Sequence, residues 1–84
     1  MYFDLSIKDA NAFEQLVQTA FVLNSDNAFK QVILCTQAAH RFVAVGDIDR
    51  AEAWLRLAPQ VDDLKQLVLR AQHAVEAYRV ARSA

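Results

Sequence analysis

The sequence of 84 residues contains one glycine, one proline and one cysteine. A single glycine excludes the glycine-rich loops that hold nucleotide phosphates. A single cysteine, Cys35, excludes an internal disulfide and favours a reducing compartment. The N-terminus lacks the basic and apolar regions of a signal peptide, and no apolar run approaches the roughly 18–20 residues of a membrane span. We therefore expect a cytoplasmic protein without a membrane segment.

The charges are nearly balanced, with nine Lys and Arg residues against ten Asp and Glu residues. No basic run is interleaved with aromatic residues, so the sequence disfavours nucleic acid as a partner. The distribution is uneven, because residues 1–29 hold four acidic residues and one lysine, whereas residues 64–84 hold four basic residues and one glutamate. The two ends either attract each other within the fold, face water, or offer a basic last helix to an acidic partner.

Hydrophobic residues make up 55% of the chain, more than one small core is expected to cover. A chain of this length forms a single domain over residues 1–84, with a narrow margin of stability. We therefore expect the surplus apolar surface to lie at an interface, either with another protein or with a second copy in a homo-oligomer, in the simplest case a dimer.

Apolar residues recur at spacings of three and four, which is typical of amphipathic helices. The predicted fold class is all-α, a small antiparallel four-helix bundle with helices at about 8–23, 28–45, 48–58 and 60–82. Residues 1–6 alternate apolar and polar side chains but have no second strand to pair with, so we expect an extended N-terminal arm. The alternative is a strand that pairs with a copy or joins a partner's sheet.

The apolar stripes of the first two helices define the expected core. The first stripe contains Phe13, Leu16, Val17, Ala20, Phe21 and Leu23. The second contains Phe29, Val32, Ile33, Cys35, Thr36, Ala39, Phe42 and Val43.

Residues that favour caps and turns mark the first helix boundaries. Ser6, Asp9 and Asn11 offer N-caps, and Glu14 follows Asn11 by three residues as in a capping box. Residues 24–27, Asn-Ser-Asp-Asn, predict the turn to the second helix.

Gly46 and Pro59 bracket the short third helix. Glycine adopts the left-handed conformation that commonly ends a helix, and Asp47 is placed to cap the next one. Pro59 disfavours a helical Ala58 and predicts that the fourth helix begins directly after it.

The fourth predicted helix has the most regular apolar pattern, as in a heptad seam. The seam contains Val61, Leu64, Val68, Ala71, Val75 and Tyr78, widened by Leu67, Ala74 and Ala81. A helix of roughly 35 Å is too long for the short third helix to cover, so we expect the second helix or another subunit to cover the rest.

Residues 35–59 resemble a tetratricopeptide repeat, a helix–turn–helix unit of about 34 residues. Small residues at Ala39 and Ala51 and large residues at Phe42 and Leu55 fit the pattern, because small side chains let two helices approach closely. The chain departs from the pattern at the usual tryptophan, which is a cysteine here, and no second repeat follows.

The resemblance implies a protein-binding module whose first helix lines a concave groove. Its groove-lining positions are Ile33, Thr36, His40, Val43 and Ala44. The complete predicted protein-binding set is Ile33, Thr36, His40, Val43, Trp54, Arg70 and Arg79. Trp54 belongs either to the core or to the binding patch, because large aromatic residues carry much of the energy of interfaces.

We expect no catalytic residues, no cofactor and no metal site. Cys35 and His40 lie about 140° apart on a helix and share no face, which argues against a metal-binding or nucleophilic pair. His73 and Glu76, three residues apart, would complete a metal site only in a dimer.

The sequence therefore predicts a non-catalytic protein–protein interaction module that acts as an adaptor, chaperone or inhibitor of a larger complex, including a regulator of the mobile-element type. The alternative is a DNA-associated transcriptional regulator with a helix-turn-helix element around Gly46. Three acidic residues beside two arginines on its would-be recognition helix disfavour this alternative.

Overall fold

A computed structural model of the chain describes residues 10–83. The elements are α1 (Ala10–Leu23), α2 (Ala28–Ala44), α3 (Ile48–Leu57), the 3-10 helix η1 (Asp62–Leu64) and α4 (Lys65–Ser83). The predicted all-α fold with four α-helices is confirmed, and residues 10–83 contain no strand. The predicted arm, the caps at Ser6 and Asp9 and the helix start at residue 8 lie outside the described residues.

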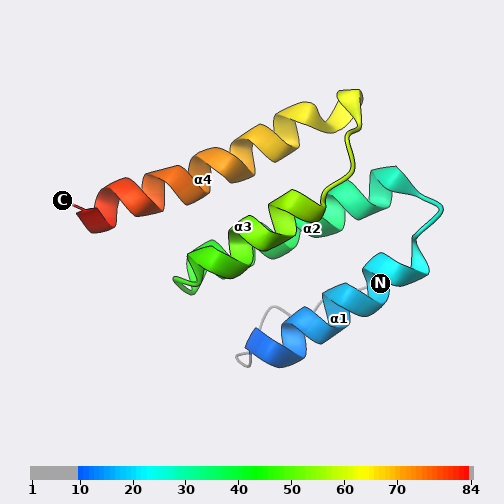
Figure 1. Ribbon diagram of the computed structural model, residues 1–84, viewed down its shortest axis with the longest axis horizontal. Coiled ribbons are helices and arrows are strands. Elements are labelled where there is room, and N and C mark those ends of the chain that lie inside the picture. The colour runs from blue at the N-terminus through cyan, green and yellow to red at the C-terminus, as the bar shows by residue number, and fades with distance from the viewer. Residues whose placement is uncertain (1–9, 84) are drawn as a thin grey trace.

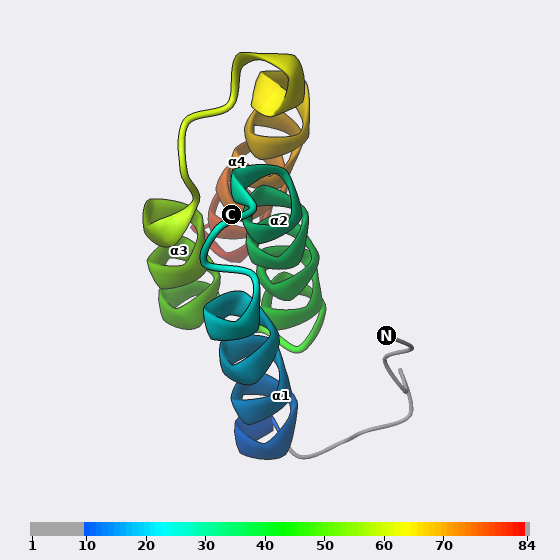
Figure 2. The same cartoon turned by 90° about the vertical axis from the view of Figure 1, so that its right-hand side faces the viewer.

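The four helices form a stack, with the α2–α3 hairpin in the middle and α1 and α4 on opposite sides of it (Figures 1 and 2). Helices that follow each other in the sequence run antiparallel (Figure 1). Because α1 and α4 are separated by the hairpin, the described part of the acidic first segment does not face the basic last helix. The attraction between the two ends that the charge distribution allowed is therefore not found in these helices.

The core lies where α2 meets the other three helices. Ala39, Phe42 and Ala51 are fully buried, and the ring of Phe13 packs edge-on against Phe42, with 5.7 Å between the ring centroids. The small side chains of Ala39 and Ala51 allow α2 and α3 to approach closely, as their spacing predicts.

The turn around Gly46 has the predicted conformation. Gly46 has a φ of +83°, in the left-handed region that a side chain disfavours. Its N–H donates to the carbonyl of Val43 at 3.0 Å, and the N–H of Asp47 donates to that of Phe42 at 2.8 Å, which together form a Schellman motif. The Asp47 carboxylate then accepts from the backbone N–H of Arg50 and caps α3, as predicted.

The turn between α1 and α2 also agrees with the sequence. The side chain of Asn27 accepts from the N–H of Lys30 at 3.1 Å and caps the start of α2. The amide of Asn24 donates to the carbonyl of Ala20 at 2.8 Å near the end of α1.

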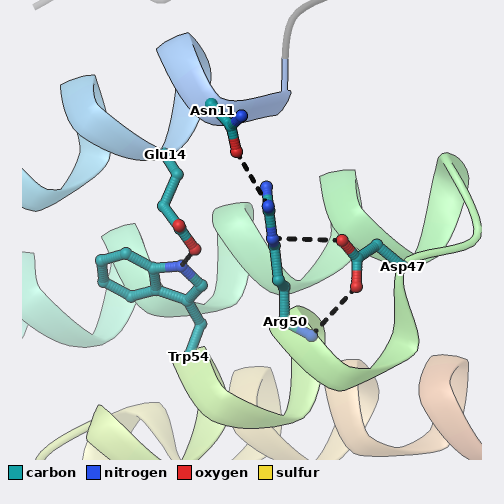
Figure 3. Close-up of polar contacts among 5 residues, drawn as sticks. All are labelled: Asn11, Glu14, Asp47, Arg50 and Trp54. Atoms are coloured by element: carbon teal, nitrogen blue, oxygen red, sulfur yellow. Dashed lines mark hydrogen bonds and ion pairs between the residues drawn. The ribbon is translucent and has the colours of Figure 1, made fainter.

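The capping box predicted at Asn11 and Glu14 is wrong, because Asn11 is already the second residue of α1. Both side chains instead reach α3 (Figure 3). Asn11 accepts from a terminal guanidinium nitrogen of Arg50 at 2.8 Å, and Glu14 accepts from the indole N–H of Trp54 at 3.0 Å. The sequence could not reveal this, because both contacts join residues about forty positions apart in the chain.

The predicted start of the last helix, at residue 60, is also wrong. Ala58 is extended, with φ −64° and ψ 124°, as expected for a residue before proline. Val61 is extended as well, and α4 begins only at Lys65, after η1. Two acidic residues, Asp62 and Asp63, lie in the first turn of η1, where the helix dipole favours negative charge.

The seam on α4 is only partly covered. Ala71 and Val75 are buried, and α4 packs against both α2 and α3, which confirms the prediction that α2 would cover part of this helix. The remaining seam residues are half-buried, except for Ala81, which is exposed.

Candidate functional site

Within residues 10–83, one side of α2 carries no neighbouring helix. Figure 2 shows α1, α3 and α4 around α2, which leaves its fourth side open. Five exposed residues follow this side at spacings of three or four. We call them the α2 face: Phe29, Ile33, Gln37, His40 and Ala44. The two apolar residues, Phe29 and Ile33, are 46% and 37% exposed.

The expected burial of Phe29 and Ile33 is therefore wrong, whereas the groove-lining assignments of Ile33, His40 and Ala44 fall on an accessible surface. Val43 is half-buried and packs against the core.

Thr36 and Trp54 cannot contact a partner, which corrects their place in the predicted binding set. Thr36 is buried, and its hydroxyl donates to the carbonyl of Ile33 at 2.9 Å. Trp54 is 3% exposed, and its ring packs edge-on against Phe21 with 6.0 Å between the ring centroids. Of the two interpretations of Trp54, the core is correct, because α1 folds back over α3 and covers the indole.

The two arginines of the predicted set lie on different sides of α4. Arg79 forms an ion pair with Glu52 of α3. It also lines a cleft of about 270 Å³ between α3 and α4. Arg70 is exposed and does not line the cleft. It precedes Gln72, a cleft residue, by two positions, and two positions on a helix correspond to about 200° of rotation. Arg70 therefore lies on the side of α4 opposite to Gln72.

The cleft between α3 and α4 has a mixed lining that offers no evident chemistry. It is lined by Glu52, Leu55, Arg56, Gln72, Val75, Glu76 and Arg79. Glu52 pairs with both Arg79 and Arg56, the latter at 3.8 Å, so its carboxylate is held by neighbours. The described residues contain no group of three or more His, Cys, Asp or Glu side chains placed to hold a metal ion.

Cys35 is fully buried, and this burial raises the pKa of its thiol to about 11. A thiol in this environment stays protonated at neutral pH and is a poor nucleophile. Among helices α1 to α4, as far as they are described, none is long and apolar enough to cross a membrane.

The arginines of α3 are engaged within the chain. Arg50 pairs with Asp47 at 3.2 Å and also donates to Asn11 (Figure 3). Its guanidinium lies 5.7 Å from the centre of the Phe42 ring. Arg56 lies close to Glu52. The side chain of Arg56 is 77% exposed, so of the two cations on the would-be recognition helix only Arg50 is held by several groups of the chain.

The sequence missed a second exposed apolar surface, on α1. Leu16 and Leu23 were expected in the core, yet both are exposed, and Leu23 and Val22 are 71% and 68% exposed. The signal that could have found this surface is the charge pattern, because Glu14 is the single charged residue in the sequence of α1.

Comparison with known proteins gives no further guidance: no protein-family model, curated protein or solved structure matches this chain.

Proposed function

We propose that this chain is a non-catalytic protein-interaction module whose α2 face binds a segment of a larger protein. The observation that carries the proposal is the open side of α2, where Phe29 and Ile33 are exposed next to the polar residues Gln37 and His40. An apolar centre with polar side chains around it is the usual composition of a protein interface.

The resemblance to a tetratricopeptide repeat supports the same surface. It implies that the first helix of the hairpin, which is α2 here, lines the binding groove. Ile33, His40 and Ala44 are groove-lining positions on this alignment, and all three are accessible. Arg70 is exposed on α4, which packs against α2, and its charge would favour a partner segment with an acidic residue next to its apolar ones.

A module of this kind acts by occupying a site on its partner rather than by chemistry. We therefore propose the role of a cytoplasmic adaptor, chaperone or inhibitor, with a regulator of the mobile-element type included among the inhibitors.

Affinity capture with matched variants tests the proposal. The immobilised wild-type chain, Ile33→Asp and Val80→Asp are each exposed to an extract of the native host, and the retained proteins are identified by mass spectrometry. Val80 is the control, because it is 61% exposed but lies on α4. We expect a protein that the wild type and Val80→Asp retain and that Ile33→Asp loses.

Circular dichroism of each variant checks that its helices are intact. A folded Ile33→Asp variant that retains the same proteins as the wild type would refute the assignment of the α2 face.

A further inference from the structure

The two outer helices of the stack expose surfaces of different composition. The α1 face consists of Gln15, Leu16, Gln18, Thr19, Val22 and Leu23, all of them exposed. Among the described residues of α1, no exposed side chain is charged. The exposed residues of α4, in contrast, include Lys65, Arg70, Glu76, Arg79 and Arg82.

The absence of charge from the α1 face follows from the packing of α1. Its single charged residue, Glu14, turns toward α3 and accepts the indole hydrogen bond of Trp54 (Figure 3). In a stack of helices, the terminal elements need a polar outer face to remain soluble. α4 has such a face, whereas α1 combines three large apolar side chains with neutral polar ones.

We propose that the α1 face is the contact between two copies of this chain, related by a twofold axis. In such a contact the same surface occurs on both sides, so residues near the axis meet their own copies. A charged residue there would face a like charge, and the α1 face has none.

The polar residues of the α1 face also fit a second copy. The amides of Gln15 and Gln18 each contain a donor and an acceptor, so each can pair with the same group from the other chain. The hydroxyl of Thr19 donates to the carbonyl of Gln15 at 2.9 Å within α1. Leu16, Val22 and Leu23 supply the apolar area. A partner selected by charge would find no ionic group on this face, so we favour a second copy.

The size of the surface sets the expected strength of the contact. α1 has 14 residues and is therefore about 21 Å long. A single helix of this length offers less than the roughly 800 Å² per partner of a standard interface. We therefore expect a reversible dimer whose population depends on the protein concentration, and not a permanent one.

Light scattering across a dilution series tests the proposal, with Val22→Glu and Val80→Glu as a matched pair. Both valines are largely exposed and lie in the last turn of their helices, so the new charge has the same effect on each helix dipole. We expect wild type and Val80→Glu to approach twice the chain mass of 9.5 kDa at high concentration. We expect Val22→Glu to weaken the dimer by about tenfold or more.

Two results would overturn the proposal. One is a mass of a single chain at every concentration, which would leave the α1 face for a different protein. The other is a dimer that Val22→Glu and Val80→Glu affect equally, which would place the contact elsewhere.

A mixture of Val22→Glu and Val22→Lys provides a positive test, because the two variants should pair with each other more strongly than either pairs with itself.

A cross-link provides a second positive test. A single cysteine introduced at Thr19, near the middle of α1, should form a disulfide between two chains under mild oxidation. The native Cys35 will not interfere, because it is fully buried. Failure of both tests would contradict a contact through α1.

These experiments separate the dimer from the function proposed for α2. Ile33→Asp should lose the captured partner and keep the dimer, whereas Val22→Glu should lose the dimer and keep the captured partner.

Discussion

The helices α1 and α4 occupy equivalent places at the two ends of the stack but are held in different ways. α1 is attached by Phe13 and Phe21, whose rings contact buried aromatic residues, and by hydrogen bonds from α3 to Asn11 and Glu14. α4 buries Ala71 and Val75, and its ion pair with α3, from Arg79, is partly exposed to solvent.

This comparison shows that exposed apolar residues occur on a helix that is itself anchored by contacts with buried aromatic rings. α1 buries larger side chains than α4, whereas α4 packs against both α2 and α3, and α1 has the less polar outer surface. Two polar side chains of α1, Asn11 and Glu14, accept hydrogen bonds from Arg50 and Trp54 of α3. Because Glu14 is the charged residue of α1, this leaves the outer face of α1 without charge. α4 buries smaller side chains, Ala71 and Val75, against α2 and α3, and it has a charged outer face.

The largest effect should come from the aromatic contact between α1 and α3. We expect Trp54→Ala to lower the free energy of unfolding by about 3–5 kcal/mol, because it removes a buried ring. Val75→Ala, in the contact of α4, should cost about 2 kcal/mol. Urea unfolding followed by circular dichroism measures both. If Val75→Ala costs as much as Trp54→Ala, the buried ring of Trp54 does not dominate the contact between α1 and α3.

Removing a polar contact should also lower the free energy of unfolding more at α1 than at α4, although both losses should be smaller. Glu14→Ala leaves the buried indole N–H of Trp54 without its acceptor and should cost about 1–3 kcal/mol. Glu14→Gln keeps an acceptor oxygen and serves as the matched control, with a smaller loss. Arg79→Ala at the other end removes an exposed ion pair and should cost less than about 1 kcal/mol. Equal losses for Glu14→Ala and Arg79→Ala would remove the distinction between the two ends.

Gly46→Ala tests how the central turn depends on α4. The left-handed φ of Gly46 should make this change cost about 1–2 kcal/mol. The added Cβ would also lie 2.7 Å from the Tyr78 hydroxyl oxygen, which forces that side chain of α4 to move. We expect the double variant Gly46→Ala/Tyr78→Phe to recover only a small part of the stability that Gly46→Ala loses, as measured by thermal unfolding. If the double variant recovers most of the lost stability, the clash with Tyr78 of α4, and not the left-handed backbone of residue 46, causes the loss.

The ionisation of Cys35, which lies in the core between the two ends, should have no effect on stability at neutral pH, and its effect should appear only at alkaline pH. Burial raises the pKa of its thiol from 9.0 to about 11. The folded chain therefore holds this proton more tightly than the unfolded chain, and stability should fall as the pH rises from 9.0 toward about 11. Cys35→Ala should reduce this slope in urea unfolding series. An unchanged slope would show that other groups cause it.

Local signals predicted most of the fold. The Asn-rich turn, the left-handed Gly46 and the Asp47 cap depend on neighbouring residues, so the sequence placed them correctly. The start of α4 was misplaced because Pro59 is compatible with both a first helical turn and an extended segment, and its sequence neighbours do not decide between them.

The site was harder to predict, because it depends on which side of each helix its neighbours cover. Spacing placed Leu16 and Leu23 with the core residues of α1, but the position of α2 leaves both exposed. In the same way, Trp54 became a core residue only because α1 folds over α3, which is a contact between distant parts of the chain.

The most direct test of the difference between the two ends is amide hydrogen exchange of the wild-type chain at low and high concentration. If two copies meet through α1, exchange in residues 10–23 should slow as the concentration rises, while exchange in residues 65–83 stays the same. Equal rates in α1 at both concentrations, or slowing confined to α4, would contradict the account.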